Sequence, residues 1–219
     1  MIQAILFDLD GTLTDTLPLY IKSYNRALKK QHINLTIREI VDICFGKTVE
    51  VACAKLGIPE KTEEFLNSYL EGVKTHFKEG KLFEGVTECL NLAKEKQIKL
   101  AVISFAYNWY VKEMIKRLQL NKYFDKVIGF NDITKAKPDP EAVTLVCRKF
   151  GIQPSKAIVL GDAKSDIIMG KSAGCKTVLF YPREYKSFYD LEDLKESNPD
   201  KIIKNFKNLK EIIIKNTLC

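Results

Sequence analysis

The sequence predicts an α/β fold: a Rossmann-like doubly wound parallel sheet core with an inserted small α-helical cap domain. Short apolar runs alternate with segments of helical periodicity along most of the chain. This alternation is typical of a parallel sheet with helices on both faces. Residues 16–81 break the pattern and show helical periodicity alone. Some 66 residues far exceed an ordinary connection, whose median is about 4–6 residues, so this stretch is expected to be an inserted domain.

The apolar runs define the predicted strands. Ala4–Phe7 contains an Ile and runs directly into Asp8, as expected for a buried strand followed by a loop. Four comparable runs follow at residues 100–104, 126–130, 157–160 and 177–181. The pair Ile202–Ile203 indicates a further strand at an edge of the sheet.

The helices are predicted from apolar residues spaced three and four positions apart. In the core this spacing occurs in residues 86–93, 111–118, 142–150 and 206–214. In the insert it occurs in residues 20–28, 37–44 and 65–73. The resulting division assigns residues 1–15 and 82–219 to the Rossmann-like catalytic core and residues 16–81 to the helical cap.

Composition and length are those of an ordinary soluble globular protein. The chain has 219 residues, of which 46% are hydrophobic and 29% charged. No apolar run approaches the roughly 18 residues needed to span a bilayer, and the N-terminus lacks the basic region of a signal peptide. The six cysteines form no CxxC pair and mostly lie among apolar residues, so we expect buried, reduced thiols and a cytoplasmic location.

The net charge of +7 first suggests nucleic acid as a partner, because 35 Lys and Arg residues face 28 Asp and Glu residues. However, residues 201–219 contain five lysines and one acid, so 5 − 1 = +4 belongs to the tail. Nucleic-acid-binding proteins normally show a clustered basic patch or a recognisable motif. We find neither, and we expect no nucleic-acid and no membrane partner. Nothing in the sequence indicates an oligomeric state.

Acidic and hydroxyl side chains follow three of the predicted strands. Asp8 and Asp10 follow the first strand, Ser104 follows the second, and Asp162 and Asp166 follow the run at 157–160. In α/β sheets ligands bind beyond the carboxyl ends of the strands. Neighbouring carboxylates repel one another unless a cation lies among them. Because oxygen ligands suit Mg²⁺ and no Cys/His cluster is present for zinc, the sequence predicts a Mg²⁺ site.

Lys137 follows the predicted strand at 126–130, within the segment Lys-Pro-Asp-Pro. A single lysine is by default a solvated surface residue. Beside a cluster of acids, a cation and a phosphate, a charge-stabilising role is the better interpretation.

Together these segments resemble the four motifs of the haloacid dehalogenase superfamily. Residues 8–15 (DLDGTLTD) resemble the first motif, Ser104 the second, Lys137 the third and residues 161–166 (GDAKSD) the fourth. The helical insert falls where this family carries its small C1 cap. The resemblance is to the phosphoglycolate phosphatase and β-phosphoglucomutase branch.

The resemblance implies Mg²⁺-dependent hydrolysis of a small phosphorylated metabolite through a covalent aspartyl-phosphate. Asp8 would be the nucleophile and Asp10 the general acid and base, and an Asp at this second position favours phosphoryl transfer over dehalogenation. Ser104 would bind the phosphate, and Lys137 would stabilise its charge. The implied Mg²⁺ ligands are Asp8, the backbone carbonyl of Asp10, Asp162 and, through a water, Asp166.

Several alternatives stay open. A sugar phosphomutase of the β-phosphoglucomutase type shares the motifs and the cap. A non-catalytic phospho-accepting module resembling a response-regulator receiver would also gather acids and a Lys, although receivers do not shelter their Asp beneath a cap. In the cap, Gly46 and Lys47 lie in a segment, Phe-Gly-Lys-Thr, that resembles the loop which C1 caps lower onto the site. Lys47 is either solvated or in contact with substrate.

Overall fold

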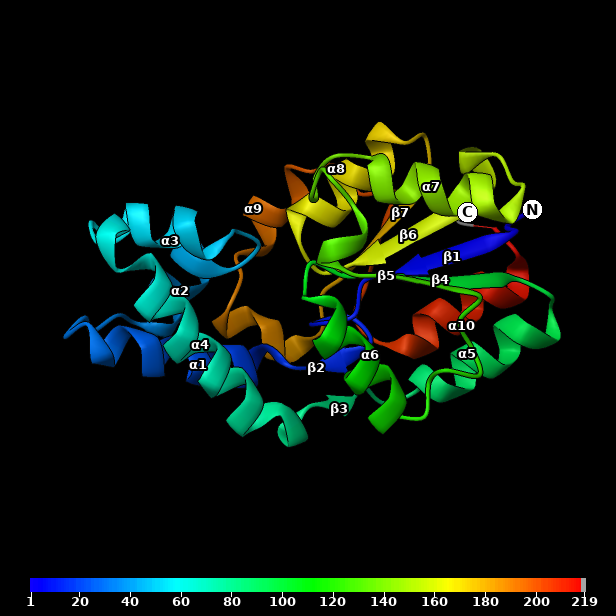
Figure 1. Ribbon diagram of the computed structural model, residues 1–219. Coiled ribbons are helices and arrows are strands. Elements are labelled where there is room, and N and C mark those ends of the chain that lie inside the picture. The colour runs from blue at the N-terminus through cyan, green and yellow to red at the C-terminus, as the bar shows by residue number, and fades with distance from the viewer. Residues whose placement is uncertain (218–219) are drawn as a thin grey trace.

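A six-stranded parallel sheet forms the centre of the computed structural model, which describes residues 1–217 (Figure 1). In spatial order its strands are β5 (Lys126–Ile128), β4 (Lys99–Ile103), β1 (Ala4–Phe7), β6 (Ala157–Gly161), β7 (Lys176–Phe180) and β8 (Lys201–Ile203). The first strand is therefore central, with Leu6 beside Ala101 of β4 and Val159 of β6. The predicted doubly wound sheet is confirmed, and the crevice expected at such a switch in strand order lies beyond the carboxyl end of β1.

Helices cover both faces of the sheet, because alternate strand residues point to opposite sides. Ile5 and Phe7 share a hydrophobic cluster with helices on one face, and Ala4 and Leu6 share a cluster with helices on the other. The first face carries α5 (Val86–Glu95), α6 (Asn108–Arg117) and α10 (Phe206–Lys215). The second face carries α7 (Glu141–Phe150) and α8 (Lys164–Ser172).

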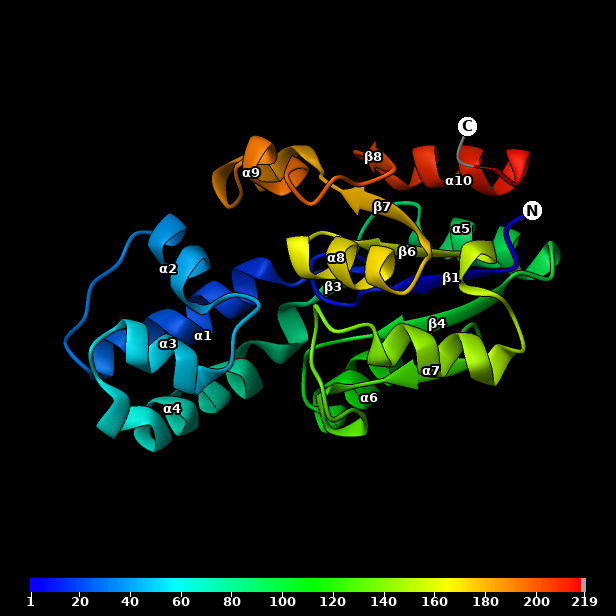
Figure 2. The same ribbon diagram turned by 90° about the horizontal axis from the view of Figure 1, so that it is seen from above.

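The helical cap stands apart from the sheet with a hydrophobic core of its own (Figure 2). Its helices are α1 (Leu17–Lys30), α2 (Ile37–Cys44), α3 (Val49–Lys55) and α4 (Thr62–His76). Two short antiparallel strands, β2 (Thr14–Asp15) and β3 (Lys81–Leu82), pair where the chain enters and leaves the cap. The division of domains at residues 15 and 82 stays a prediction, which this pairing supports.

Some elements differ from the predicted ones. The pair of two-residue strands, α3 and α9 (Leu191–Lys195) are too short to carry a readable periodicity. β5 ends at Ile128 because the N–H of Gly129 donates to Asp132 Oδ2 at 2.9 Å and turns the chain. Ile37, predicted on the buried face of α2, is 45% exposed as the first residue of that helix. Short 3-10 turns occupy Pro59–Lys61, Phe77–Glu79, Phe130–Asp132, Pro154–Lys156 and Arg183–Ser187.

The cysteines lie inside the protein as predicted. Within residues 1–217 the cysteines are buried and form no disulfide. They are Cys44, Cys53, Cys89, Cys147 and Cys175. The sixth, Cys219, lies outside the described residues. No helix in the described part of the chain has the length and apolar character needed to cross a lipid bilayer.

Candidate active site

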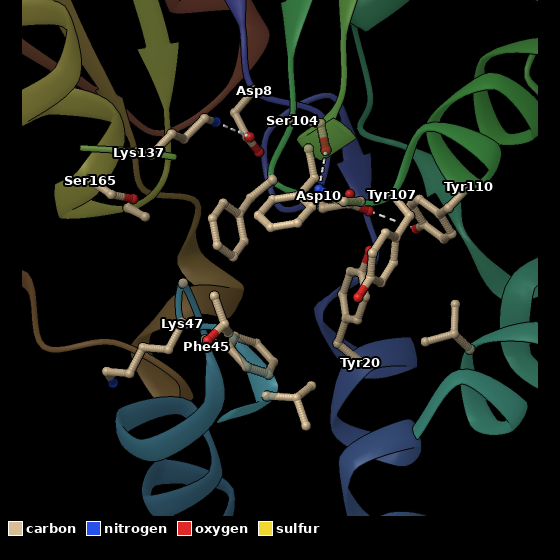
Figure 3. Close-up of a pocket in the computed structure, with 18 of the residues that line it drawn as sticks. Asp8, Asp10, Tyr20, Phe45, Lys47, Ser104, Tyr107, Tyr110, Lys137 and Ser165 are labelled. Carbon is tan, nitrogen blue, oxygen red and sulfur yellow. Dashed lines mark hydrogen bonds and ion pairs between the residues drawn. The ribbon is translucent and has the colours of Figure 1, made fainter. Parts of the chain in front are cut away.

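A cavity of about 230 Å³ lies between the cap and the carboxyl ends of the strands. Its polar side, here called the floor, comprises Asp8, Asp10, Ser104, Lys137, Asp162 and Asp166. Aromatic side chains of the cap and of the loops after β4 and β5 line the other sides (Figure 3). The structure thus gathers the strand-end residues singled out in the sequence around one space, as expected for parallel strands whose carboxyl ends share an edge.

Lys137 joins two of the floor carboxylates. Its Nζ donates to Asp8 Oδ1 at 2.5 Å, to Asp166 Oδ1 at 2.7 Å and to the carbonyl of Ile103 at 2.8 Å. Burial would lower the pKa of Lys137, but the carboxylates of Asp166 and Asp8 outweigh burial and raise it. Burial raises the pKa of Asp8 to about 7, although Lys137 opposes the shift. The lysine therefore stays charged beside Asp8, which titrates near neutrality.

Asp162 follows β6 and is 3% exposed. Its Oδ1 accepts a hydrogen bond from Thr12 Oγ1 at 3.0 Å. Gly11 makes this approach possible: its φ is +87°, and a Cβ there would lie 2.5 Å from Asp162 Oδ2. Burial raises the pKa of Asp162 well above its usual value, and the charges of Asp8 and Asp166 raise it further. Asp162 is therefore a buried carboxylate next to like charges.

Asp10 has a different environment from Asp8, two residues before it. Its Oδ1 accepts hydrogen bonds from the hydroxyls of Tyr110 at 2.7 Å and Thr16 at 2.8 Å. Burial raises the pKa of Asp10, while these hydroxyls and that of Tyr20 lower it in part. Asp8 is thus paired with a cation and Asp10 with neutral donors.

Ser104 follows β4 and is 2% exposed. Its Oγ accepts a hydrogen bond from the N–H of Ala106 at 3.1 Å, which fixes the loop that follows. In this loop the rings of Phe105 and Tyr107 pack edge-on against Phe130, with centroids 5.2 and 5.7 Å apart. The aromatic loop therefore forms part of the cavity lining beside Ser104.

The cap loop after α2 also reaches the cavity. Phe45, Gly46 and Lys47 line it, as the sequence predicts for this loop. The ammonium of Lys47, however, donates to the backbone carbonyl of Asp42, and Figure 3 shows the side chain directed away from Asp8. Its contact with a substrate stays a prediction.

The floor suits a Mg²⁺ ion by its chemistry. Asp162 accepts a hydrogen bond from the uncharged hydroxyl of Thr12, and it lies near two further carboxylates. Within residues 1–217 no group of three or more His, Cys, Asp or Glu side chains is placed to hold a metal. The predicted ligand set needs two direct carboxylates and one backbone carbonyl, and Mg²⁺ often takes one or two carboxylates together with waters and phosphate oxygens. The residues therefore fit this ion.

The sequence did not single out the hydroxyls that hold the acids. Thr12 lies within the first motif and Thr16 directly follows it. Their closeness in sequence to Asp8 and Asp10 could have indicated these contacts. Tyr110 reaches Asp10 from α6, 100 residues further along the chain. No local pattern could have predicted that contact, because it depends on how α6 packs against the sheet.

Comparison with known proteins agrees with this architecture. A family profile described as haloacid dehalogenase-like hydrolase matches residues 5–180. A Clostridium perfringens protein named provisionally as the pyrophosphatase PpaX is 35% identical, over 91% of this chain and 92% of its own. A phosphoglycolate phosphatase from Haemophilus influenzae is 30% identical, over 96% and 98%. A Thermotoga maritima structure named provisionally as a β-phosphoglucomutase is 30% identical, with a TM-score of 0.76 and coverage of 96% and 100%.

These relatives span the branch that the four motifs predict, and their names point to different substrates. The match to the profile covers all four motifs, from Asp8 to Asp166. The chain therefore belongs to the haloacid dehalogenase-like hydrolase family.

Proposed function

We propose that this phosphatase of the haloacid dehalogenase-like family hydrolyses a small phosphate monoester in a Mg²⁺-dependent reaction, through a covalent phosphoryl group on Asp8. The observation that carries the proposal is the unlike surroundings of Asp8 and Asp10. One is paired with Lys137, and the other is held by the hydroxyls of Tyr110 and Thr16. Neighbouring acids in contrasting environments are the usual arrangement for a nucleophile and an acid–base pair.

In the first step, an oxygen of Asp8 attacks phosphorus and the bond from phosphorus to the leaving oxygen breaks. Asp10 donates a proton to that oxygen, so the leaving group departs as an alcohol. The raised pKa of Asp10 supports this role, because it keeps more of the carboxyl protonated. Lys137 and Ser104 hold the phosphoryl oxygens, on which negative charge is spread in the transition state.

In the second step, Asp10 takes a proton from water, and the water oxygen attacks the phosphorus bound to Asp8. The bond between phosphorus and Asp8 breaks, which releases inorganic phosphate and restores both carboxyl groups. The hydroxyls of Tyr110 and Thr16 keep Asp10 in one position through both steps.

The proposed cofactor is Mg²⁺, held by Asp8, the backbone carbonyl of Asp10 and Asp162, with Asp166 acting through a water. When bound, Mg²⁺ neutralises charge on the transferring phosphoryl group. The floor residues supply four carboxylates and one lysine, so without a further cation an anionic ester meets a negative surface.

We further propose that the substrate is a free small metabolite met in the cytoplasm. The buried and unpaired cysteines of the described residues support a reducing compartment. The acidic floor argues against a polyanionic partner such as nucleic acid.

The test is phosphate release from a panel of phosphorylated metabolites with Mg²⁺ present, using the wild type and Asp8→Asn. Asp42→Asn is the matched control, because Asp42 is an exposed acid of the cap. We expect Asp8→Asn to lose at least about 10⁴-fold in kcat and the control to keep its activity. Wild-type turnover by Asp8→Asn, or no phosphate release by the wild type from any ester, would contradict the proposal.

A sugar phosphomutase remains the second candidate, since one similar structure carries that provisional name. It would return the phosphoryl group to a sugar instead of to water. Stoichiometry separates the two: one inorganic phosphate for each ester consumed supports the phosphatase, and an isomeric sugar phosphate without free phosphate supports the mutase.

A further inference from the structure

We propose that the cavity selects phosphate monoesters whose leaving group carries a neutral aromatic or heteroaromatic ring. The inference rests on the proposed function and names its substrate class. It comes from the rings that line the cavity outside the floor, here called the aromatic wall: Tyr20, Tyr24, Phe45, Tyr69, Phe105, Tyr107, Trp109 and Phe130.

The aromatic wall draws rings from both domains. In the cap, Tyr24 and Tyr69 are stacked with their centroids 4.4 Å apart, and Phe45 packs 5.7 Å from Tyr24. On the core side, Phe105 and Tyr107 pack against Phe130. Ring faces and edges left open toward a cavity favour another flat ring in offset or edge-on contact.

Apart from Tyr24, which is 6% exposed, these rings are not fully enclosed in the hydrophobic cores. Phe65, a structural ring of the cap, is 0% exposed, whereas Trp109 is 39% exposed. Phe45 and Tyr69 are partly buried and pack at the margin of the cap cluster, where they border the cavity. Aromatic surface left beside the reacting groups is available to a ligand.

The charges of the lining argue against a second anionic group on the substrate. Among the described lining residues the cations are Lys137 and Lys47. Lys137 is engaged by two carboxylates, Lys47 donates to the backbone carbonyl of Asp42, and Glu50 adds a negative charge elsewhere in the lining. A carboxylate or second phosphate on the leaving group would lose water without gaining a free cation, which is costly.

The size of the cavity agrees with one ring. A cavity of about 150 Å³ lined by apolar side chains can hold benzene. At about 230 Å³ this cavity is larger by roughly the space of a phosphoryl group. The cavity therefore has room for a single ring linked to phosphate.

The test compares three esters with primary alcohol leaving groups: benzyl phosphate, cyclohexylmethyl phosphate and 2-phosphoglycolate. With Mg²⁺ present we expect kcat/KM for benzyl phosphate to exceed that for the cyclohexylmethyl ester by about 2–10-fold and that for phosphoglycolate by about 10-fold or more. Equal values for the ring and its saturated counterpart would overturn the preference for rings. Faster turnover of phosphoglycolate would overturn the whole inference and leave the phosphatase assignment intact.

A variant of the aromatic wall sharpens the comparison. Phe45→Leu removes the ring but keeps an apolar side chain, and it should reduce the preference for benzyl over cyclohexylmethyl phosphate to about 1–2-fold. Phe188→Leu is the matched control, since Phe188 is also a partly buried ring packed against the cap cluster and is not among the lining residues. An unchanged preference in Phe45→Leu would contradict the assignment of this ring.

Equilibrium binding separates the inference from the proposed function. Trp109, the single tryptophan of the sequence, lines the cavity, so its fluorescence reports occupancy. Even if no ester is hydrolysed, benzylphosphonate should bind about 10-fold more tightly than phosphonoacetate. If benzylphosphonate binds more tightly but no ester is hydrolysed, the proposed hydrolysis is refuted and the preference of the cavity for a ring stands. If phosphonoacetate binds more tightly, the preference for a ring is refuted.

Discussion

The floor and the aromatic wall of the cavity are built in contrasting ways. The floor places charged side chains at strand ends, each held by a fixed partner, such as Lys137 on Asp8 and Tyr110 on Asp10. The aromatic wall consists of rings from the cap and from connecting loops, with few charges among them. A rigid sheet thus positions the reacting groups, while loops and an inserted domain shape what can enter. Relatives of this chain carry names with different substrates, and a shaping wall that is separate from the reacting groups is compatible with such variety.

After loss of the nucleophile Asp8 itself, removing the cation of the floor is expected to have the largest effect on kcat. Lys137→Met leaves Asp8 and Asp166 without their shared partner and removes a positive charge from the phosphoryl site. We expect kcat to fall about 10²–10³-fold, measured as phosphate release with Mg²⁺ present. Lys135→Met is the control, because that side chain is 72% exposed. If Lys137→Met keeps its rate while circular dichroism shows a folded protein, the floor does not act as described.

Metal binding to the floor is expected to stabilise the fold. With Mg²⁺ at 100 times its dissociation constant, the free energy of unfolding should rise by about 2.7 kcal/mol. Asp162→Asn should lose this gain, because it removes a carboxylate proposed as a ligand. Thermal melts of both proteins with and without Mg²⁺ measure it. An equal rise in melting temperature in the wild type and Asp162→Asn would show that Mg²⁺ binds at a site without Asp162.

Loss of the Tyr110 hydroxyl that holds Asp10 should lower kcat less than loss of the Lys137 charge. Tyr110→Phe removes the hydrogen bond to Asp10 Oδ1 and leaves the ring in place. Since a hydrogen bond to a charged group contributes about 1.5–3 kcal/mol, we expect kcat to fall by about 10–100-fold. Tyr123→Phe, at another buried tyrosine of the same cluster, serves as the control. Equal rates for the two variants would show that Tyr110 does not position Asp10.

The smallest effect on activity is expected at the opposite end of the strands. Asp200 Oδ2 accepts hydrogen bonds from the N–H and hydroxyl of Thr177 at 2.8 and 2.9 Å. Asp200→Ala should lower the free energy of unfolding by about 1–2 kcal/mol and leave kcat/KM unchanged. A loss of activity in the folded variant would show that the floor is not independent of this end of the sheet.

The same variant has a predicted pH dependence. Partial burial would raise the pKa of Asp200, but the hydrogen bonds from Thr177 and the nearby lysines outweigh it and lower the pKa below its usual 3.8. A carboxyl with a lowered pKa stabilises the fold above its unfolded value and loses that contribution as the pH falls through the folded value. Denaturant titrations should therefore show wild type and Asp200→Ala converging in stability below about pH 3.8. A difference that grows on acidification would contradict this.

The floor could be predicted from the sequence more fully than the aromatic wall. Asp8 and Asp162 stand at the ends of apolar runs, and Lys137 precedes a proline in the loop that follows β5, so local signals mark all three. The contact between Tyr110 and Asp10 depends on the packing of a distant helix, which no local pattern encodes. The β2–β3 pair could not be predicted from a local pattern either. Each strand has only two residues, and the two strands are separated in sequence by the whole cap.

The aromatic residues of the wall can be read from the sequence, but the sequence does not predict that they line one cavity. Phe105 and Tyr107 follow Ser104 directly, whereas Phe45 belongs to a loop of the cap. They border one cavity because the cap lies over the carboxyl ends of the strands. Helical periodicity predicts which side of a helix is buried, but it does not say which domain covers the other side.

If the floor works through a phosphoryl group on Asp8, that group can be trapped and located. Asp10→Asn removes the proposed base of the second step, so the covalent intermediate should accumulate with Mg²⁺ and a reactive phosphate ester. Acid quenching, proteolysis and mass spectrometry then locate the phosphoryl group. We expect the phosphoryl group on Asp8 in Asp10→Asn, and no phosphoryl group in the Asp8→Asn, Asp10→Asn double variant. A phosphoryl group found on Ser104 would contradict the account.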